Sequence, residues 1–137
     1  MTINEMRSRV FTLGNRLVAE IGDRSMAFEK AWEIVQAGSV EVAVKGVSFG
    51  TRQEALSRLA TYKPADVWAF IMPETENPVD PAALAVMVMV NGGNGVYRLG
   101  YIPRELTGVI RAMRNTRPAL KVIAGDINGA RLRLSVC

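Results

Sequence analysis

The sequence predicts an α+β protein: a helical hairpin followed by a small, partly open β-barrel of the SH3-like or OB-like kind with two short helices. Three observations support this fold class. The chain has 137 residues, 49% of them apolar and 22% charged, which is the balance of a globular protein with a core of its own. The hydrophobic period changes from that of a helix to that of a strand after Gly38. Beyond that point, short apolar segments alternate with turn residues.

Residues 3–37 are expected to form two helices. The first carries an apolar stripe at three- and four-residue intervals, made of Met6, Val10, Leu13, Leu17 and Ile21. Gly22 ends this helix, and Asp23 is placed to cap the next one, which Gly38 ends. The second helix carries a stripe of Phe28, Trp32 and Val35. Such stripes usually face a core, and the alternative is a docking or dimerisation element.

A half-buried strand follows Gly38, because Val40, Val42 and Val44 alternate with other residues. The next expected elements are a turn over Gly46–Thr51, a short helix over Arg52–Tyr62 with Ala55, Leu56 and Leu59 inward, a strand over Asp66–Met72 and a Pro- and acid-rich loop over Pro73–Pro81.

The segment Ala82–Val90 is apolar at every position. It suits a central strand with one face on the barrel core and the other under the helices. The remaining expected elements are a hairpin turn over Asn91–Gly95, a strand over Val96–Ile102, a helix from Pro103 to about Asn115, and a hairpin of strands Leu120–Ala124 and Ala130–Val136. Arg131 and Arg133 alternate with apolar residues in the last strand, so both guanidinium groups share one face.

Charge and composition exclude several function classes. The net charge is +4, and residues 98–137 hold eight basic and two acidic side chains, which favours phosphate-bearing partners. The absence of histidine excludes His-dependent triads and the common His/Cys zinc sites. The single cysteine, Cys137, permits no internal disulfide and fits a reducing, cytoplasmic setting. No apolar run is long enough to span a membrane, so no membrane partner is expected.

An acidic loop raises the alternative of a metal-dependent nuclease. Glu74, Glu76 and Asp80 place three carboxylates close together, and Mg²⁺ sites need several oxygen ligands. Nothing else in the chain completes such a site. Acidic residues in a Pro-rich loop are typical turn formers, so no enzyme activity, metal or cofactor is expected.

Three sequence blocks carry a resemblance to a known family. They are Lys45–Leu56, Glu76–Ala83 and Leu99–Leu106. In this order and spacing they resemble the HIRAN domain, a small β-barrel of DNA-remodelling ATPases and of stand-alone bacterial and phage proteins. The resemblance covers roughly residues 39–125 and leaves the N-terminal helices outside it. It favours two domains, a helical hairpin over 1–38 and a HIRAN-like barrel over 39–137.

The resemblance implies a non-enzymatic module that binds single-stranded DNA and captures its 3′-hydroxyl end. By motif, Ser48, Phe49, Asn77 and Asp80 would approach the terminal nucleotide, and the stretch Gly100–Arg104, which includes Tyr101, would flank the backbone. Phe49 would stack on a base, and Asp80 would accept a hydrogen bond from the 3′-hydroxyl and repel a 3′-phosphate. The residues expected to track phosphates are Arg98, Arg104, Arg111 and Arg114, with Arg131 and Arg133 adding charge.

Two positions depart from the family pattern and support an alternative function. Position 48 is Ser where DNA-capturing members carry a basic residue, and position 79 is Val where many carry an aromatic one. The first hypothesis is an accessory DNA-processing factor that binds DNA ends, with the choice between DNA and RNA open. The alternative is a protein-interaction module, for instance a phage inhibitor of a host defence nuclease such as a CRISPR effector. It would dock or form a homodimer through the Phe28, Trp32 and Val35 stripe or the barrel surface.

Overall fold

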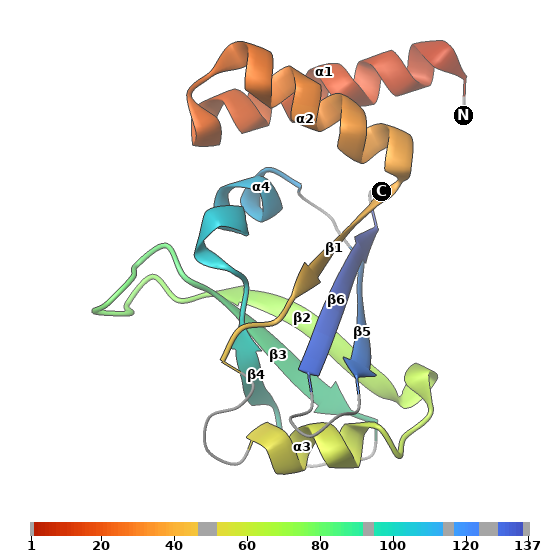
Figure 1. Ribbon diagram of the computed structural model, residues 1–137, viewed down its shortest axis with the longest axis vertical. Helices are drawn as coiled ribbons and strands as arrows, with labels where there is room; N and C mark the ends of the chain where they lie inside the picture. Colours follow the sequence, from red (N-terminus) through yellow and green to blue (C-terminus); the bar gives the residue numbers. More distant parts are fainter. Residues whose placement is uncertain (1, 47–51, 92–94, 114–116, 124–128, 136–137) are drawn as a thin grey trace. The chain divides into compact units, whose positions relative to one another are not determined.

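The computed structural model describes residues 2–46, 52–91, 95–113, 117–123 and 129–135. These residues form an α+β fold, which confirms the predicted class (Figure 1). The chain forms two compact units. The first consists of Met1–Val40, Gly108–Arg117 and Leu134–Cys137, and the second consists of Glu41–Thr107 and Pro118–Arg133. The first unit therefore holds more of the chain than the two N-terminal helices.

The two N-terminal helices begin and end where the sequence predicts. Helix α1 spans Ile3–Ile21 and ends at Gly22, whose φ of 87° is the left-handed conformation that favours glycine. Helix α2 spans Arg24–Ala37, and the Asp23 side chain caps it by accepting a hydrogen bond from the Met26 N–H at 3.0 Å. Local capping chemistry thus sets both boundaries.

The buried side of α2 differs from the expected stripe. Val35 is buried, but Phe28 is half-buried and Trp32 is exposed. The buried residues of this helix are Ala27, Ala31, Ile34 and Val35. Small residues allow α1 and α2 to approach closely: a Cβ atom added at Gly14 of α1 would lie 2.7 Å from the Phe28 ring. Close helix packing selects this alanine-rich face, and the larger aromatic side chains lie at its margin.

The strands form two three-stranded sheets, both antiparallel (Figure 1). One sheet has the order β2-β3-β4, with β2 at Val67–Pro73, β3 at Leu84–Val90 and β4 at Tyr97–Tyr101. The other has the order β1-β6-β5, with β1 at Ser39–Ala43, β6 at Gly129–Ser135 and β5 at Arg117–Ile123. The described helices of the remaining chain are α3 at Arg52–Leu59 and α4 at Thr107–Ala112, with short 3₁₀ turns at Pro64–Asp66 and Arg104–Leu106.

Strand β3 is central in its sheet, as predicted, but only one of its faces is fully covered. Leu84, Val86 and Val88 point into the core and are buried. On the opposite face Met87 is half-buried and Met89 is 38% exposed. The expectation that both faces of this segment are covered is therefore wrong at the C-terminal end of β3, around Met87 and Met89. A run of Ala, Val and Met has no period of two, so its sequence does not distinguish the two faces.

Among the described residues, a backbone bridge joins the segment after β1 to strand β4. Lys45 and Tyr101 exchange two N–H···O hydrogen bonds, each 2.8 Å long. A Cβ atom at the neighbouring Gly100 would collide with the Lys45 carbonyl oxygen and lie 2.7 Å from Val44 Cγ1. The described strands remain two sheets rather than a closed barrel. No helix in the described part of the chain is long and apolar enough to cross a membrane.

Candidate nucleic-acid interface

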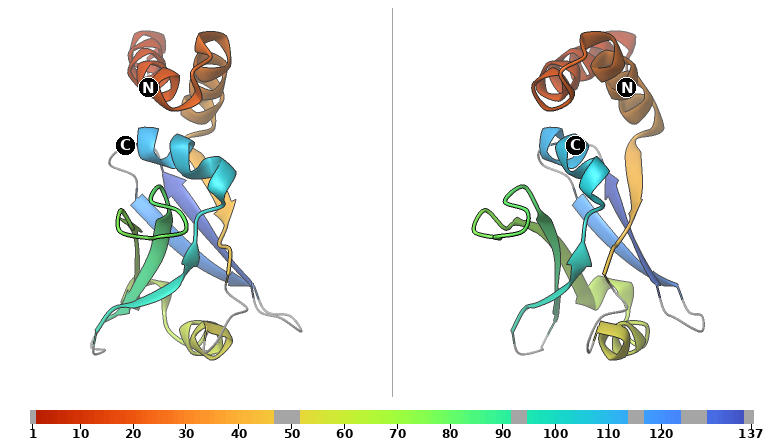
Figure 2. Two further views of the ribbon diagram at one scale, coloured as in Figure 1. Left: turned by 90° about the vertical axis from the view of Figure 1, so that its left-hand side faces the viewer. Right: turned by 60° about the vertical axis from the view of Figure 1, so that its left-hand side comes forward.

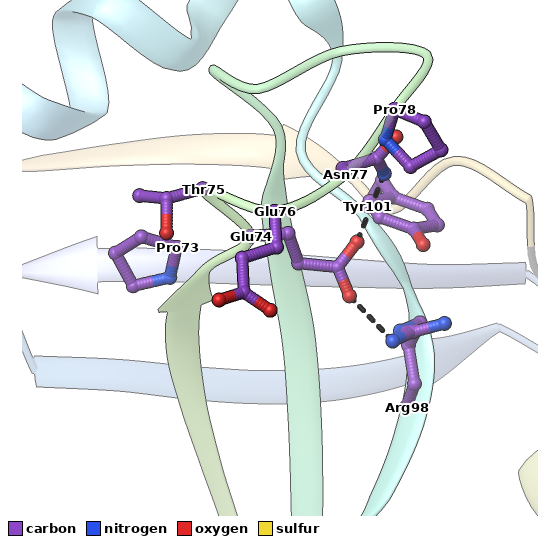
Figure 3. A pocket seen from close by; sticks show the side chains of 8 residues that line it. All are labelled: Pro73, Glu74, Thr75, Glu76, Asn77, Pro78, Arg98 and Tyr101. Atoms are coloured by element: carbon purple, nitrogen blue, oxygen red, sulfur yellow. Dashed lines mark hydrogen bonds and ion pairs between the residues drawn. The ribbon is translucent and has the colours of Figure 1, made fainter.

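The loop between β2 and β3 is organised by one asparagine. Asn77 Oδ1 accepts hydrogen bonds from the backbone N–H groups of Val79 at 2.9 Å and Asp80 at 3.1 Å. Asn77 Nδ2 donates to Glu74 Oε1 at 3.1 Å (Figure 3). This Asx turn fixes the backbone of the loop, which projects from the end of its sheet (Figure 2). It thereby orients the Asp80 carboxylate.

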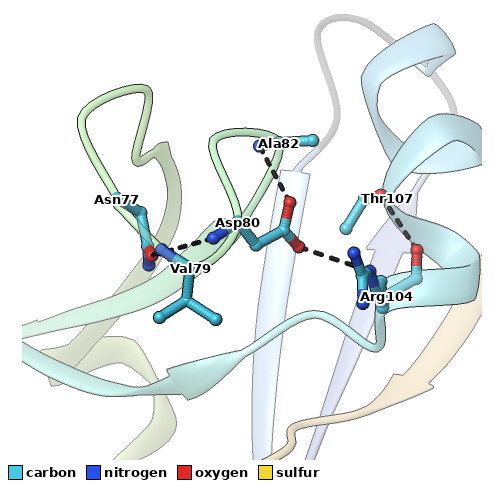
Figure 4. Close-up of polar contacts among 6 residues, drawn as sticks. All are labelled: Asn77, Val79, Asp80, Ala82, Arg104 and Thr107. Carbon is cyan, nitrogen blue, oxygen red and sulfur yellow. Dashed lines mark hydrogen bonds and ion pairs between the residues drawn. The ribbon is translucent and has the colours of Figure 1, made fainter.

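The Asp80 carboxylate has two different partners (Figure 4). Its Oδ1 accepts a hydrogen bond from the Ala82 N–H at 3.0 Å. Its Oδ2 lies 3.8 Å from Arg104 Nε. The Arg104 side chain is 83% exposed, and an exposed ion pair of this length contributes little to stability. Arg104 can therefore leave Asp80 for another anion at small cost.

These residues line an open groove of about 370 Å³, which we call the Asp80 groove. Its lining includes Asn77, Val79, Asp80, Tyr101, Pro103 and Arg104. Val79 is 88% exposed and presents its isopropyl group to the groove (Figure 4). The groove thus combines a carboxylate, an exposed guanidinium and apolar surface, a mixture suited to an amphipathic ligand.

A second depression adjoins the first, and we call it the Arg98 pocket. It measures about 500 Å³, and its lining includes Glu74, Glu76, Asn77, Arg98 and Tyr101 (Figure 3). Glu74 forms an ion pair with Arg98. Asn77 and Tyr101 line both depressions, so the two are contiguous.

Tyr101 stands at the junction of the groove and the pocket. Two guanidinium groups lie over its ring, Arg52 at 5.9 Å and Arg98 at 5.6 Å from the centroid. Burial raises the pKa of the Tyr101 hydroxyl, and a hydrogen bond to Glu74 raises this pKa further. The hydroxyl is therefore protonated at neutral pH.

The structure brings together five of the residues predicted from the sequence. Asn77, Asp80, Tyr101 and Arg104 line the Asp80 groove, and Arg98 lines the adjoining pocket. Ser48, Phe49 and Arg114 lie outside the described residues.

Two of the other predicted cations have carboxylate partners. Arg111 lies in α4, in the first unit, and forms an ion pair with Glu20 at 3.3 Å. Arg131 pairs with Glu41 across β6 and β1 at 2.9 Å. As predicted, Arg131 and Arg133 share the exposed face of β6, while the alternate residues are buried.

Sequence reasoning missed two residues of this site. Arg52 lies over Tyr101 and also donates to the Gly46 carbonyl oxygen at 2.6 Å. Glu74 binds both Asn77 and Arg98, whereas the sequence indicated a turn former or, alternatively, one ligand of a metal site. Arg52 and Tyr101, and likewise Glu74 and Arg98, are far apart in the sequence, so no local sequence pattern identifies these contacts. Among the residues described, no group of three acidic or Cys side chains is placed to hold a metal ion.

Comparison with known proteins gives one structural similarity. No protein-family model matches the chain, and no curated protein matches its sequence. A crystal structure of a Lactobacillus plantarum protein, solved by a structural genomics consortium, is similar at 20% identity and a TM-score of 0.34. The similarity covers 72% of this chain and 99% of that one.

Replacing Asn77 by alanine is expected to loosen the loop. The substitution removes the acceptor for the Val79 and Asp80 amides, and each such hydrogen bond contributes about 1 kcal/mol. Hydrogen exchange at these two amides should therefore accelerate by about tenfold or more. Thr75→Ala, an exposed change in the same loop, should leave both rates unchanged. Unchanged rates in Asn77→Ala would contradict this role for Asn77.

Proposed function

We propose that the second unit is a HIRAN-like module that binds single-stranded DNA without enzymatic activity and recognises its 3′-hydroxyl end in the Asp80 groove. The observation that carries the proposal is the pairing of Asp80 with Arg104. A hydrogen-bond acceptor with a fixed orientation and a highly exposed cation lie within 3.8 Å of one another in one open groove. A DNA end presents the complementary pair, a hydroxyl donor and a phosphate.

The chemistry of recognition follows from the two oxygens of Asp80. Oδ1 is held by the Ala82 N–H, so Oδ2 is the oxygen that accepts the terminal O–H. Arg104 then moves to the nearest phosphate of the strand, where a charge-assisted hydrogen bond replaces the weak ion pair. A 3′-phosphate would place negative charge beside the carboxylate, which disfavours binding. The groove thereby distinguishes the two kinds of end.

The test is fluorescence anisotropy with short single-stranded oligonucleotides labelled at the 5′ end. Matched oligonucleotides end in a 3′-hydroxyl or a 3′-phosphate and are titrated at low and at moderate salt. The proposal predicts salt-sensitive binding with a preference for the hydroxyl end. Equal binding to both ends would leave only a general basic surface, and no binding at low salt would overturn the proposal. An RNA oligonucleotide of the same sequence measures the preference between DNA and RNA.

Val79→Tyr is expected to strengthen this binding. Val79 lies on the groove and is 88% exposed, so a larger side chain fits without repacking the core. A tyrosine ring there would stack on the terminal base, and such stacking contributes about 1–3 kcal/mol per base. Affinity for the 3′-hydroxyl oligonucleotide should rise by about tenfold. Val96→Tyr, at another exposed position, is the control and should not raise the affinity. If Val79→Tyr did not tighten binding either, the terminal base would not lie beside Val79.

A protein-interaction module is the second candidate function. It is favoured by aromatic exposure on the helical hairpin, where Phe11 and Trp32 are both exposed and Phe11 contacts the Phe28 ring. Exposed aromatic clusters are typical of protein-binding surfaces. Sedimentation of the wild type and of Phe11→Ser would test self-association. A dimer that this substitution dissociates would favour the second candidate, and a concentration-independent monomer would exclude a homodimer.

A further inference from the structure

The outer face of the β2-β3-β4 sheet is unusually apolar for a surface. Trp68 and Phe70 of β2 alternate with inward residues; Trp68 is 60% exposed and Phe70 is half-buried. Met89 and Met87 are their cross-strand partners on β3. The register continues to β4, where Met87 pairs with Arg98. Cross-strand partners point to the same face of a sheet, so these side chains form one surface.

This surface, which we call the Trp68 face, consists of Trp68, Phe70, Met72, Met87, Met89 and Arg98. Its loop end is continuous with the candidate site. Met72 pairs with Ala85, which is fully buried, so the connection to the site runs through Arg98 rather than along this row. Arg98 belongs to the face and to the pocket. A ligand that leaves the groove past Tyr101 therefore meets Arg98 and then the aromatic residues.

The charge and spacing of the face fit a single nucleic-acid strand. Strands β2, β3 and β4 contain no Asp or Glu, and their one charged residue is Arg98, which is paired with Glu74 of the β2–β3 loop. Side chains on one face of a strand recur about every 6.8 Å, so Phe70 and Trp68 offer two rings in succession along β2. Sheet surfaces that bind single strands use aromatic side chains arranged in this way to stack successive bases.

We propose that the Trp68 face carries the single-stranded DNA on the 5′ side of the captured end, with bases stacked on Phe70 and Trp68. The inference rests on the proposed end-binding function and extends it from one nucleotide to a track. The last two nucleotides would occupy the Asp80 groove and the Arg98 pocket. The preceding ones would cross the sheet toward Trp68.

The chain contains two tryptophans, Trp32 and Trp68, so Trp32→Phe makes Trp68 the only indole reporter. The full-length Trp32→Phe protein is titrated with thymidine oligonucleotides of two, four and six residues that carry a free 3′-hydroxyl. We expect the dinucleotide to bind without changing Trp68 fluorescence, and the hexanucleotide to quench it. Trp68→Leu should weaken hexanucleotide binding by about tenfold and leave dinucleotide binding unchanged. Trp32→Leu, at an exposed tryptophan of α2, is the matched control and should change neither.

The outcomes separate this inference from the proposed function. If the dinucleotide binds, but longer oligonucleotides neither quench Trp68 fluorescence nor bind more tightly, the track is overturned and end capture remains supported. Quenching by the hexanucleotide that is equal for 3′-hydroxyl and 3′-phosphate ends supports the track and overturns end capture. A wild-type dimer that Trp68→Leu dissociates means that a second copy of the chain covers the face, which overturns the track. The absence of binding to any oligonucleotide overturns both proposals.

Discussion

Replacing Asp80 by alanine should abolish the preference for a 3′-hydroxyl end. The substitution removes Oδ2, the acceptor that faces the groove, and with it the negative charge that repels a terminal phosphate. A hydrogen bond to a charged group contributes about 1.5–3 kcal/mol, so affinity for the hydroxyl end should fall by about 10- to 100-fold. Affinity for the phosphate end should rise or stay constant. Anisotropy with the two matched oligonucleotides measures both effects.

Two further variants show whether the loss is local. Asp80→Asn retains an oxygen that accepts from the Ala82 N–H and so preserves the turn, but it removes the negative charge. The preference for the 3′-hydroxyl end should therefore shrink although the loop stays folded. Glu76→Ala removes a carboxylate from the same loop at a position outside the Asp80 groove. If Glu76→Ala changed the end preference as strongly as Asp80→Ala, net loop charge rather than Asp80 geometry would explain the effect.

Among glycine-to-alanine substitutions in the described strands, Gly100→Ala is expected to destabilise the protein most. Its Cβ would overlap the Lys45 carbonyl oxygen, which belongs to backbone, and would press on the buried Val44. The Lys45–Tyr101 bridge must then open or shift. Overpacking of this kind costs about 1–3 kcal/mol, and the lost bridge adds about 1 kcal/mol for each hydrogen bond. Urea denaturation should show a lower midpoint with an unchanged slope.

Gly129→Ala provides the control for this prediction. No atom lies within 4 Å of a Cβ added at Gly129, and its φ is not in the left-handed region. Its free energy of unfolding should stay within about 0.5 kcal/mol of the wild type. Equal midpoints for Gly100→Ala and Gly129→Ala would show that the Lys45–Tyr101 bridge does not constrain Gly100. Because Tyr101 follows Gly100, a destabilised Gly100→Ala protein should also bind oligonucleotides more weakly.

Elements with local signals could be predicted from the sequence, and features set by tertiary packing could not. Asp23 and Gly38 mark the ends of α2 because capping and left-handed conformations depend on a few neighbouring residues. The buried face of α2 was predicted only in part: Val35 is buried, but Ala27, Ala31 and Ile34 form the rest of that face, and Phe28 packs at its margin on Gly14. The second face of β3 was predicted wrongly, since a uniformly apolar segment carries no information about which side is covered.

The candidate site follows the same rule. Asn77 and Asp80 were predicted from the resemblance, whose motif spans only four residues here, and the structure places both in one turn. The contacts of Glu74 with Arg98 and of Arg52 with Tyr101 join the β2–β3 loop and helix α3 to strand β4, so only the fold brings them together. The alternation of Trp68 and Phe70 was visible in the sequence, but the exposure of that face was not.

The most direct test of the central claim is an amide ¹H–¹⁵N titration of the full chain with a thymidine dinucleotide that carries a free 3′-hydroxyl. We expect the resonances of Val79, Asp80, Ala82 and Arg104 to shift first, and the 3′-phosphate dinucleotide to leave them in place. Shifts confined to α1 and α2, or no shifts at the Asp80 groove under conditions where the dinucleotide binds, would contradict this expectation.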